Sequence, residues 1–510
     1  MISASIVINY LLASVSAALL GISRYGKKFL DSVAVSMAIL GLAMSIALML
    51  NSYRNSVEVY TFGGFRPPLG IVYYADFINS ILSLLSSFAT IISIVVAYIT
   101  MDYNTRKYFY PLAFLLATGA QGFIFSGDLF HLYVSTELVA ISSYALTGLY
   151  SNKRNCVRAA IIYGITGTAI TNFLLLAVVL IYGSYGTVNM ADIALKSMNP
   201  EATTPFSGRV FGDILHSSTV ALAIMTWVFL FKSGIMPNHF WLPRVYRAAP
   251  IASIILFSSS ADILGVYGIL RLYHIAFSCR SVIATFRQTM LSMLTPLSLT
   301  SALFSSLLTA RQTTFRGIVA YSTIAQLSLA LSGTVLGVPE LVAGGILHMV
   351  ANALGDTSVL LGYAVHAKAC GKKLHILSKV LVATGLLNLF GVIPVVPGFW
   401  SKALMVWGFV EEGVLAGAVI VLISTGLCAI GYLKLILRFF HMEDVKSDLG
   451  MVAKCTTKMQ WTLATVASLL IAVVIGVGLA LISVPKLINI FLDLTSNSID
   501  VLTYISNVLP

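Results

Sequence analysis

Runs of about 20 apolar residues, the length that crosses a bilayer as a helix, recur along most of this chain. Hydrophobic residues make up 58% of its 510 residues and charged residues only 10%, whereas soluble domains carry roughly 25% charged residues. Such a chain has few polar positions with which to cover a surface exposed to water. The sequence therefore predicts an all-α polytopic membrane protein.

Fourteen of these runs are predicted as membrane-spanning helices. They lie near residues 2–21, 31–50, 77–100, 110–126, 128–150, 159–182, 215–240, 251–270, 289–309, 318–337, 340–365, 377–403, 414–437 and 460–484. Most of the loops between them are short, so no soluble catalytic domain is expected.

The distribution of basic residues predicts how these helices are oriented. Twenty of the 31 basic residues fall in loops that follow odd-numbered spans, and eight fall in the remaining loops and the C-terminal segment. Because loops rich in Lys and Arg stay in the cytoplasm, both termini are expected outside. The same distribution accounts for the net charge of +12 without nucleic acid. Arg271, Arg280 and Arg287 run against this rule.

Neither a cofactor nor a metal is expected in this chain. Its five cysteines, Cys156, Cys279, Cys370, Cys428 and Cys455, are scattered and form no Cys-x-x-Cys pair, the spacing typical of metal sites. No glycine-rich phosphate-binding loop is present in the sequence. If the chain takes part in redox chemistry, the electron transfer has to occur in another subunit.

Two of the predicted spans are interrupted in the same way, by Gly-x-x-Pro followed by Phe-Trp. The residues that define the breaks are Gly234 and Pro237 in the seventh span and Gly391, Pro394 and Pro397 in the twelfth. Proline removes a backbone donor and clashes with the preceding turn, so each helix is expected to break. Lys232 and Lys402 lie beside the two breaks. Paired broken helices in corresponding halves indicate a transporter with its ion path near the middle of the membrane.

A carboxylate, Glu137, lies halfway along the fifth span. An ionisable residue inside a membrane span is costly and faces a cavity or a partner. We therefore expect Glu137 to form one end of an ion pair with Lys232 that can take up and release protons. The alternative is a buried pair that only fixes the packing of the helices.

A stripe of polar residues marks the eleventh span. His348, Asn352 and Asp356 recur every four residues, so they share one face of a helix. Such a face, turned toward the inside of the bundle, can hold a hydrogen-bonded chain of water, and histidine exchanges protons near neutral pH. The alternative is a polar seam that contributes only to helix packing.

Two further ionisable residues are candidates for the same path. Lys402 follows the second break and is expected to form the far end of the path, unless its side chain extends to the membrane surface. Asp262 lies mid-span beside Ser258, Ser259 and Ser260. Asp262 is either a carboxylate that relays protons or a packing partner for a neighbouring basic residue.

Ionisable residues near the span edges are interpreted differently. Asp76, Asp128 and His239 are expected to be interfacial or helix-capping residues. Lys434, near the end of a span, is expected to extend its side chain to the surface.

Several motifs along the chain carry a family resemblance. They are Phe62–Ile71 with its Gly-Gly-x-x-Pro-Pro, the helix of Glu137, Gly183–Asp192, Lys232–Pro243, Ala249-Pro250, Ala320–Gln326 and Gly398–Lys402. In this order they resemble the antiporter-type membrane subunit shared by complex I, membrane-bound nickel–iron hydrogenases and Mrp-type cation/proton antiporters. The resemblance covers residues 57–440, and the proline-rich motif is more similar to the hydrogenase and Mrp branch.

This resemblance implies two inverted five-helix repeats, with one broken helix in each. The repeats would occupy residues 110–275 and 288–440, after three N-terminal helices in residues 1–109 and before a C-terminal helix and tail in residues 441–510. It also implies a hydrated polar axis at mid-membrane. Carried over by motif, Glu137 and Lys232 are its pair, His348 lies along it, and Lys402 is its terminal group.

The middle of the expected axis departs from the family's pattern. Ile263 occupies a position where the family usually has lysine, and Asp262 precedes it. The helix that usually reads His-x-x-x-His-x-x-x-Lys carries His348, Asn352 and Asp356 instead. The centre has therefore lost two lysines and gained two carboxylates. Because hard cations prefer oxygen ligands, movement of Na⁺ stays open beside movement of H⁺.

Three functions are consistent with the sequence. The first is a proton- or sodium-translocating subunit of a multisubunit redox-driven complex of the complex I or membrane-bound hydrogenase type. The second is a subunit of a stand-alone Mrp-type Na⁺/H⁺ antiporter, and the third is a structural subunit that conducts nothing. The expected partners are other membrane subunits, the lipid bilayer, and H⁺ or Na⁺, in the plasma membrane of a prokaryote.

Overall fold

The computed structural model describes residues 1–23, 26–54, 56–204, 208–368, 372–441, 457–483 and 486–509. Most of these residues are helical. The α-helices are α1 (Ile2–Ile22), α2 (Gly26–Tyr53), α3 (Phe77–Thr100), α4 (Tyr103–Phe125), α5 (Leu129–Thr147), α6 (Arg154–Tyr185), α7 (Met190–Met198), α8 (Ile214–Lys232), α9 (Leu242–Ala248), α10 (Ile251–Leu256), α11 (Ile263–Arg271), α12 (Ala284–Arg311), α13 (Phe315–Val335), α14 (Pro339–Lys368), α15 (Lys372–Phe390), α16 (Pro397–Glu411), α17 (Leu415–His441), α18 (Thr457–Ser483), α19 (Lys486–Ile499) and α20 (Val501–Val508). The remaining elements are β1 (Glu58–Thr61), β2 (Val72–Ala75), the 3₁₀ turns η1 (Phe62–Gly64) and η2 (Asn238–Trp241), and the π-helical turns η3 (Phe257–Ala261) and η4 (Leu272–Ala276).

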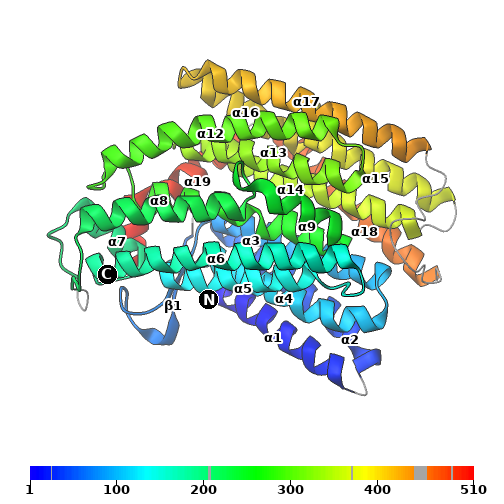
Figure 1. Ribbon diagram of the computed structural model, residues 1–510, viewed down its shortest axis with the longest axis horizontal. Coiled ribbons are helices and arrows are strands. Elements are labelled where there is room, and N and C mark those ends of the chain that lie inside the picture. Colours follow the sequence, from blue (N-terminus) through cyan, green and yellow to red (C-terminus); the bar gives the residue numbers. More distant parts are fainter. Residues whose placement is uncertain are drawn as a thin grey trace.

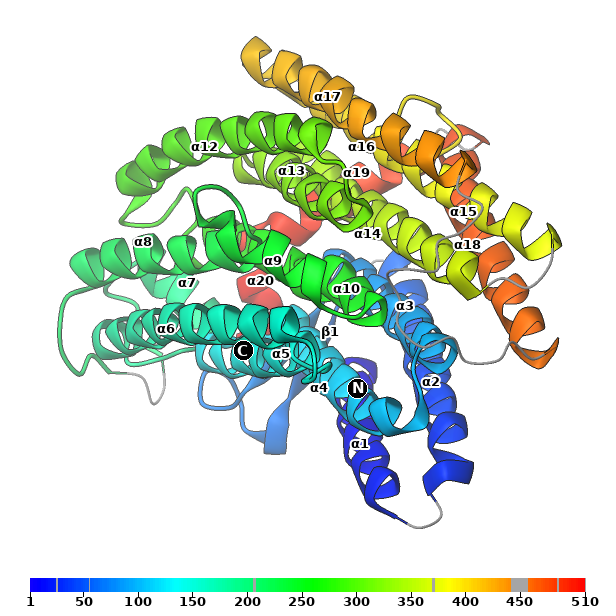
Figure 2. The same ribbon diagram turned by 45° about the vertical axis from the view of Figure 1, so that its right-hand side comes forward.

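The long helices lie side by side in one bundle, with α1 and α2 at one edge and α17 at the other (Figure 1). The turned view in Figure 2 shows the same order of helices across the bundle. In the described part of the chain, twelve helical segments are long and apolar enough to cross a membrane. The other two predicted spans coincide with α14 and with the interrupted pair α15–α16. The prediction of an all-α polytopic membrane protein is confirmed.

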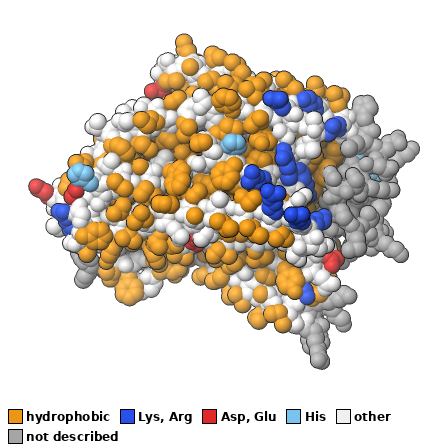
Figure 3. Space-filling model, viewed as in Figure 1, with side chains coloured by type: hydrophobic (Ala, Val, Ile, Leu, Met, Phe, Trp, Pro, Cys, Tyr) orange, Lys and Arg blue, Asp and Glu red, His pale blue; other side chains and the backbone are white. Residues whose placement is uncertain are grey.

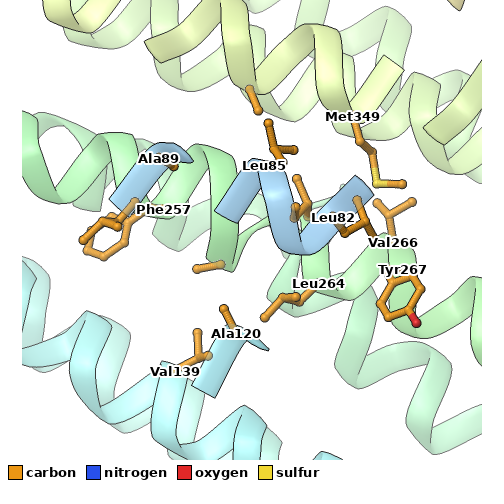
Figure 4. Close-up of a cluster of buried hydrophobic side chains, with 14 of the residues drawn as sticks. Leu82, Leu85, Ala89, Ala120, Val139, Phe257, Leu264, Val266, Tyr267 and Met349 are labelled. Atoms are coloured by element: carbon orange, nitrogen blue, oxygen red, sulfur yellow. The ribbon is translucent and has the colours of Figure 1, made fainter. Parts of the chain in front are cut away.

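Helix α3 runs through the middle of the bundle and packs against both of its halves. Leu82 and Leu85 of α3 lie near Leu264 of α11 and Met349 of α14 in a buried apolar cluster (Figure 4). Val139 of α5 belongs to the same cluster. The cluster therefore fixes the relative positions of α5, α11 and α14, the helices on or beside which the candidate ionisable residues lie.

The chain is interrupted at both positions where breaks are predicted. α8 ends at Lys232 and continues through η2 into α9, and α15 ends at Phe390 before α16 begins. Gly234 and Gly391 turn the chain with φ of 62° at each, a conformation that glycine adopts without strain. A Cβ at Gly391 would lie 2.5 Å from the carbonyl oxygen of Gly398. Glycine makes the turn, and Pro397 opens the next helix at a position where its missing N–H costs nothing.

The span after the first break contains two π-helical turns that the sequence did not predict. In η3 the amide of Asp262 donates to the carbonyl of Phe257 at 2.9 Å, five residues back. In η4 the amide of Phe277 donates to the carbonyl of Leu272 at 2.8 Å. Each π turn inserts one extra residue, so the face presented by the helix changes there.

A short antiparallel hairpin, also absent from the predicted all-helical pattern, covers the start of α1. β1 and β2 pair with Glu58 opposite Ala75. The carboxylate of Glu58 accepts hydrogen bonds from the backbone N–H groups of Ile2 and Ser3 at 2.9 and 2.8 Å and pairs with the N-terminal ammonium at 2.7 Å. A carboxylate in this place satisfies the free N–H groups at a helix start.

Two of the three arginines that ran against the charge rule are buried inside the protein. Arg271 is 3% exposed and Arg287 is 7% exposed. The guanidinium of Arg271 lies between the rings of Tyr74 and Tyr504, 5.7 and 4.8 Å from their centroids. Charges held by internal partners say nothing about which side a loop faces, so only Arg280 remains an exception.

A few residues used in the sequence analysis lie outside the described residues. They are Cys370 and Cys455, together with three of the twenty basic residues counted in loops after odd-numbered spans, namely Arg24, Lys446 and Lys454.

Candidate functional site

The first break leaves Lys232 at the C-terminal end of α8 with no capping role. The N–H of Gly234 donates to the carbonyl of Phe231 at 2.9 Å. The indole Nε1 of Trp241 donates to the same carbonyl at 3.0 Å. Lys232 Nζ is buried and has no hydrogen-bond partner among the described residues. An ammonium group in this state is available to a mobile partner.

Glu137 of α5 acts on Lys232 through space, without touching it. Glu137 supplies the acidic charge whose field reaches the ammonium group. No ion pair within 4.0 Å joins the two, and Glu137 Oε1 also has no partner among the residues that the structure describes. Lys232 borders a small, mostly apolar cavity of about 10 Å³ that Thr136 and Ala261 also line, at the lower limit of the volume that holds one water molecule. The expected direct ion pair is therefore replaced by a longer-range interaction.

The second break uses its lysine differently. Lys402 of α16 is 6% exposed, and its Nζ donates to the carbonyls of Leu389 and Phe390 at 2.7 and 2.8 Å. These are the last carbonyls of α15, which the break leaves without helical donors. A cation is favoured at this negative end of a helix. Lys402 therefore points into the protein and does not extend to the membrane surface.

The two Phe-Trp motifs that follow the breaks have a common structural role. Trp241 donates its indole N–H to the carbonyl of Phe231, and Trp400 donates to the carbonyl of Pro394 at 2.9 Å. Each tryptophan thus donates to one backbone carbonyl at its break, at the end of α8 in the first and between α15 and α16 in the second. This shared task explains why the motif occurs at both breaks.

Asp262 lies where η3 passes into α11, next to the first break. It is 1% exposed, and its Oδ2 accepts a hydrogen bond from the hydroxyl of Tyr246 at 2.7 Å. Its backbone carbonyl accepts from Ser233 Oγ at 2.6 Å. None of the ion pairs within 4.0 Å in the described part of the chain involves Asp262. Packing against a basic residue is therefore not its role.

Asp356 of α14, like Asp262, accepts a hydrogen bond from a neighbouring hydroxyl group. Asp356 is fully buried, and its Oδ2 accepts from Thr323 Oγ1 at 2.8 Å. Thr323 lies beside the Tyr246 hydroxyl, but no hydrogen bond of 3.5 Å or less joins the two in the described part of the chain. The charges of the two carboxylates act on one another. Asp262, Tyr246, Thr323 and Asp356 therefore form a central unit lined by oxygen atoms.

His348 lies in a hydrogen-bonded chain beside the second break. Its Nε2 is 2.8 Å from Gln326 Oε1 and its Nδ1 is 2.9 Å from Ser401 Oγ. Gln326 Nε2 donates to the Tyr432 hydroxyl at 2.9 Å. Ser401 precedes Lys402 in the chain, and the charge of Lys402 acts on His348. His348 is thus connected through Gln326 of α13 to Tyr432 of α17, and directly to Ser401 beside the terminal lysine.

Asn352 lies between the central unit and His348 on the same face of α14. It is 2% exposed, and neither its Oδ1 nor its Nδ2 has a partner among the described residues. Eight residues separate His348 from Asp356, which is about 12 Å along a helix. The two therefore do not touch, and a carrier is needed between them.

Sequence reasoning did not single out Tyr246, Thr323, Gln326 or Tyr432 as members of the site. Thr323 and Gln326 lie within the Ala320–Gln326 motif, so a signal was present. Tyr246 lies in a short helix that follows the first break, and Tyr432 lies in the apolar helix α17. Nothing in the local sequence of these two tyrosines marks them, because only the packing of distant helices brings their hydroxyls to the site.

The carboxylates at the span edges cap helices, as predicted. Asp76 Oδ1 accepts from the N–H of Asn79 at 2.9 Å, and Asp128 Oδ1 accepts from the N–H of His131 at 2.8 Å. Burial raises the pKa of each carboxyl to about 6. Lys434 is exposed and donates to the carbonyl of Ala310, which agrees with a position near the surface.

Three comparisons place this arrangement among known proteins. Residues 126–428 match the family described as NADH:quinone oxidoreductase/Mrp antiporter, transmembrane. The chain is 29% identical over 403 residues to the D subunit of the Na⁺/H⁺ antiporter of Alkalihalophilus pseudofirmus, with 76% of this chain and 78% of that protein covered. It is 28% identical over 421 residues to the N subunit of the NADH-quinone oxidoreductase of Desulforudis audaxviator, with 79% of each covered.

The fold is also similar to that of a protein with a solved structure. A chain of the membrane-bound sulfane sulfur reductase, an archaeal respiratory membrane complex, superposes with a TM-score of 0.85. The alignment covers 99% of each chain at 24% sequence identity.

Proposed function

Because the chain belongs to the NADH:quinone oxidoreductase/Mrp antiporter transmembrane family, we propose that it moves protons as one subunit of a multisubunit redox-driven membrane complex. The multi-pass architecture supports this, as do relatives named as components of an antiporter and of a quinone oxidoreductase. Electron transfer takes place in other subunits. The proposed setting is the plasma membrane of a prokaryote, with both termini outside.

The proposal rests on the positions of buried polar atoms that have no hydrogen-bond partner among the described residues. Such atoms include Glu137 Oε1, Lys232 Nζ, both side-chain polar atoms of Asn352, and Asp356 Oδ1. Buried polar atoms need partners, and water supplies them where there is room. Other buried polar atoms of the described residues also lack partners, but these five belong to residues that the sequence predicts to line the polar axis. Water bound along this line would connect groups that do not touch.

Proton movement would then proceed in segments. A charge shift near Glu137 alters the protonation of Lys232, since the two interact through space. A proton reaching Asp262 would pass through the hydroxyl of Tyr246, a bridging water molecule and the hydroxyl of Thr323 to Asp356. Two carboxylates that are both charged repel each other, so one proton shared between them is stabilised.

Water near Asn352 carries the proton from the central unit to His348. Imidazole can accept a proton at one nitrogen and release one from the other. Lys402, held by the end of α15, ends the path. Its fixed position lets its charge control whether His348 holds a proton.

Transport of Na⁺ is the second candidate, and the central unit is the observation that favours it. The four side chains of this unit present only oxygen atoms, and two of the four are carboxylates. Hard cations prefer such ligands. In this reading the chain would exchange Na⁺ for H⁺ at Asp262 and Asp356.

Transport by the intact complex in liposomes tests both candidates. Native complex and the Asp356→Asn variant are compared over a range of Na⁺ concentrations. Asp213→Asn is the control, because Asp213 lies at an exposed helix start, where it caps α8 and pairs with His216. Proton transport that is lost in Asp356→Asn and indifferent to Na⁺ supports the proton path. Transport that requires Na⁺ and is lost in the same variant supports the sodium path.

A Glu137→Gln variant tests whether the chain conducts at all. It keeps the size of the side chain and removes the charge that acts on Lys232. Normal assembly with unchanged ion transport in both Glu137→Gln and Asp356→Asn would leave only a structural role. An imposed Na⁺ gradient without an electron donor separates a stand-alone antiporter, which would exchange ions, from a redox-driven pump.

A further inference from the structure

A large basic cavity lies away from the polar axis, at one end of the helix bundle. Its volume is about 760 Å³, and it is formed by the segments that precede α6, α10 and α13. Lys153, Arg154, Arg247 and Arg316 line it, and none of its lining residues, all of them in the described part of the chain, is acidic. Figure 3 shows basic side chains gathered toward this end of the bundle, with hydrophobic side chains around them.

Two long helices point their N-terminal ends at the cavity. α6 begins at Arg154 and α13 begins at Phe315, and the first residues of both helices line the cavity. The N-terminal end of a helix carries a partial positive charge and free N–H groups. The helix ends therefore add to the four cationic side chains. Together they favour a ligand with concentrated negative charge.

Two of the four cations, Arg247 and Arg316, are held by hydrogen bonds, although Arg247 is exposed. Arg316 Nη1 donates to the carbonyls of Arg247 and Ala249 at 3.1 and 2.6 Å, and Arg247 Nη2 donates to a glutamine side chain at 2.9 Å. Lys153 and Arg154 are exposed at the mouth. The hydrogen bonds of Arg247 and Arg316 fix the back of the cavity, and Lys153 and Arg154 can adapt to a ligand.

The position of the cavity relative to the membrane indicates which kind of anion it binds. α6 exposes Ile161 and Ile165, which are 54% and 69% accessible, to the surroundings of the bundle. Ile161 lies seven residues after Arg154, a rise of about 10 Å along the helix. The polar layer of a bilayer is on the order of 5–8 Å deep on each side. The basic mouth therefore lies at the depth of lipid headgroups, beside a surface suited to acyl chains.

We propose that this cavity binds the phosphate group of an anionic phospholipid. Basic pockets between membrane helices on the cytoplasmic side are suited to such headgroups. The phosphate lies among the four cations, and the acyl chains extend along the apolar face of α6. The site does not depend on which ion the polar axis moves.

Native mass spectrometry of the purified, delipidated complex measures the binding directly. Phosphatidylglycerol and phosphatidylcholine with identical acyl chains are added to native complex and to a Lys153→Gln/Arg154→Gln double variant. Each basic residue near a membrane surface contributes about 1 kcal/mol to anionic lipid binding, so the double variant should bind phosphatidylglycerol about thirtyfold more weakly at this site. Phosphatidylcholine binding should not change.

Two matched variants make the result specific. Arg66→Gln/Arg280→Gln removes two exposed arginines from loops at the other end of the bundle and should bind like the native complex. Lys153→Arg/Arg154→Lys keeps both charges and should also retain phosphatidylglycerol. This pattern supports the proposal.

Three results would overturn it. The first is equal retention of phosphatidylglycerol by the Lys153→Gln/Arg154→Gln variant. The second is displacement of phosphatidylglycerol by inorganic phosphate at equal concentration, which would identify a soluble phosphate as the ligand. The third is carbodiimide cross-linking of Lys153 to a carboxylate of another subunit in the intact complex, which would identify an acidic protein segment as the occupant.

Discussion

Removing one hydroxyl group, in Tyr246→Phe, is the sharpest perturbation of the central unit. Tyr246 is fully buried, and Phe fills the same space, so packing is preserved. Its hydroxyl is the donor to Asp262 Oδ2 at 2.7 Å. A hydrogen bond to a charged group contributes about 1.5–3 kcal/mol. Since 1.36 kcal/mol is a factor of ten in rate, loss of this bond should slow proton transport by roughly 10- to 100-fold.

The assay is proton uptake by liposomes that contain the intact complex, followed with a pH-sensitive dye. Tyr185→Phe is the matched control, because Tyr185 is equally buried and loses one bond to Ser218 at 2.7 Å away from the axis. Tyr185→Phe should transport at the native rate. If Tyr246→Phe assembles normally and also transports at the native rate, the proton does not pass through this hydroxyl and the proposed link between the carboxylates is wrong.

Three further predictions follow from the breaks and the N-terminus. Gly391→Ala should lower the thermal stability of the purified complex, since the left-handed conformation costs a non-glycine residue roughly 1–2 kcal/mol and the new Cβ would lie 2.5 Å from the Gly398 carbonyl oxygen. Gly426→Ala, which has open space around it, should not lower it. Equal melting temperatures for the two variants would contradict this account. Lys402→Met should abolish transport and destabilise the second break by about 1–3 kcal/mol, because two carbonyls lose their donor. Lys402→Arg should have the melting temperature of the native complex. A Met variant as stable as the native complex would show that the capping bonds contribute little. Burial opposes the charge of Glu58, but the hydrogen bonds from the N-terminal ammonium and Ser3 outweigh burial and leave the pKa of Glu58 below 4.5. Hydrogen exchange should therefore show the first turn of α1 protected above pH 4.5, with the protection weakening as the pH falls further. Glu58→Gln should show no such dependence on pH.

Most of the fold could be predicted from the sequence, since the hydrophobic length of a span is a local property. The two broken helices were predictable for the same reason, because Gly-x-x-Pro acts on its own backbone. The π turns η3 and η4 were not. They form within a continuous apolar helix, where the extra residue is accommodated by tertiary packing and leaves no local mark. The hairpin at Glu58 was missed because its partner is the distant N-terminus.

The residues of the candidate site also fall into those that the sequence predicts and those that it does not. Glu137, Lys232, Asp262, Asp356 and Lys402 were predictable, since charge in an apolar span is costly wherever it occurs. Their neutral neighbours were not. A buried tyrosine is compatible with packing alone, and only the fold shows that the hydroxyl of Tyr246 meets a carboxylate. The sequence also could not show that Glu137 and Lys232 lack direct contact, because ion-pair distance depends on helix packing.

The two breaks look alike in sequence but leave their lysines in opposite states, and this difference gives the axis a direction. At the first break, backbone and indole donors satisfy the helix end, so Lys232 has no hydrogen-bond partner among the described residues. At the second, Lys402 itself donates to the helix end. An ammonium group without fixed bonds can lose its proton at little structural cost, whereas one that caps two carbonyls loses both bonds if it is neutralised and turned away. In the proposed proton path, Lys232 is therefore the group that would respond to charge shifts at Glu137, and Lys402 the fixed positive charge against which His348 would gain or lose its proton.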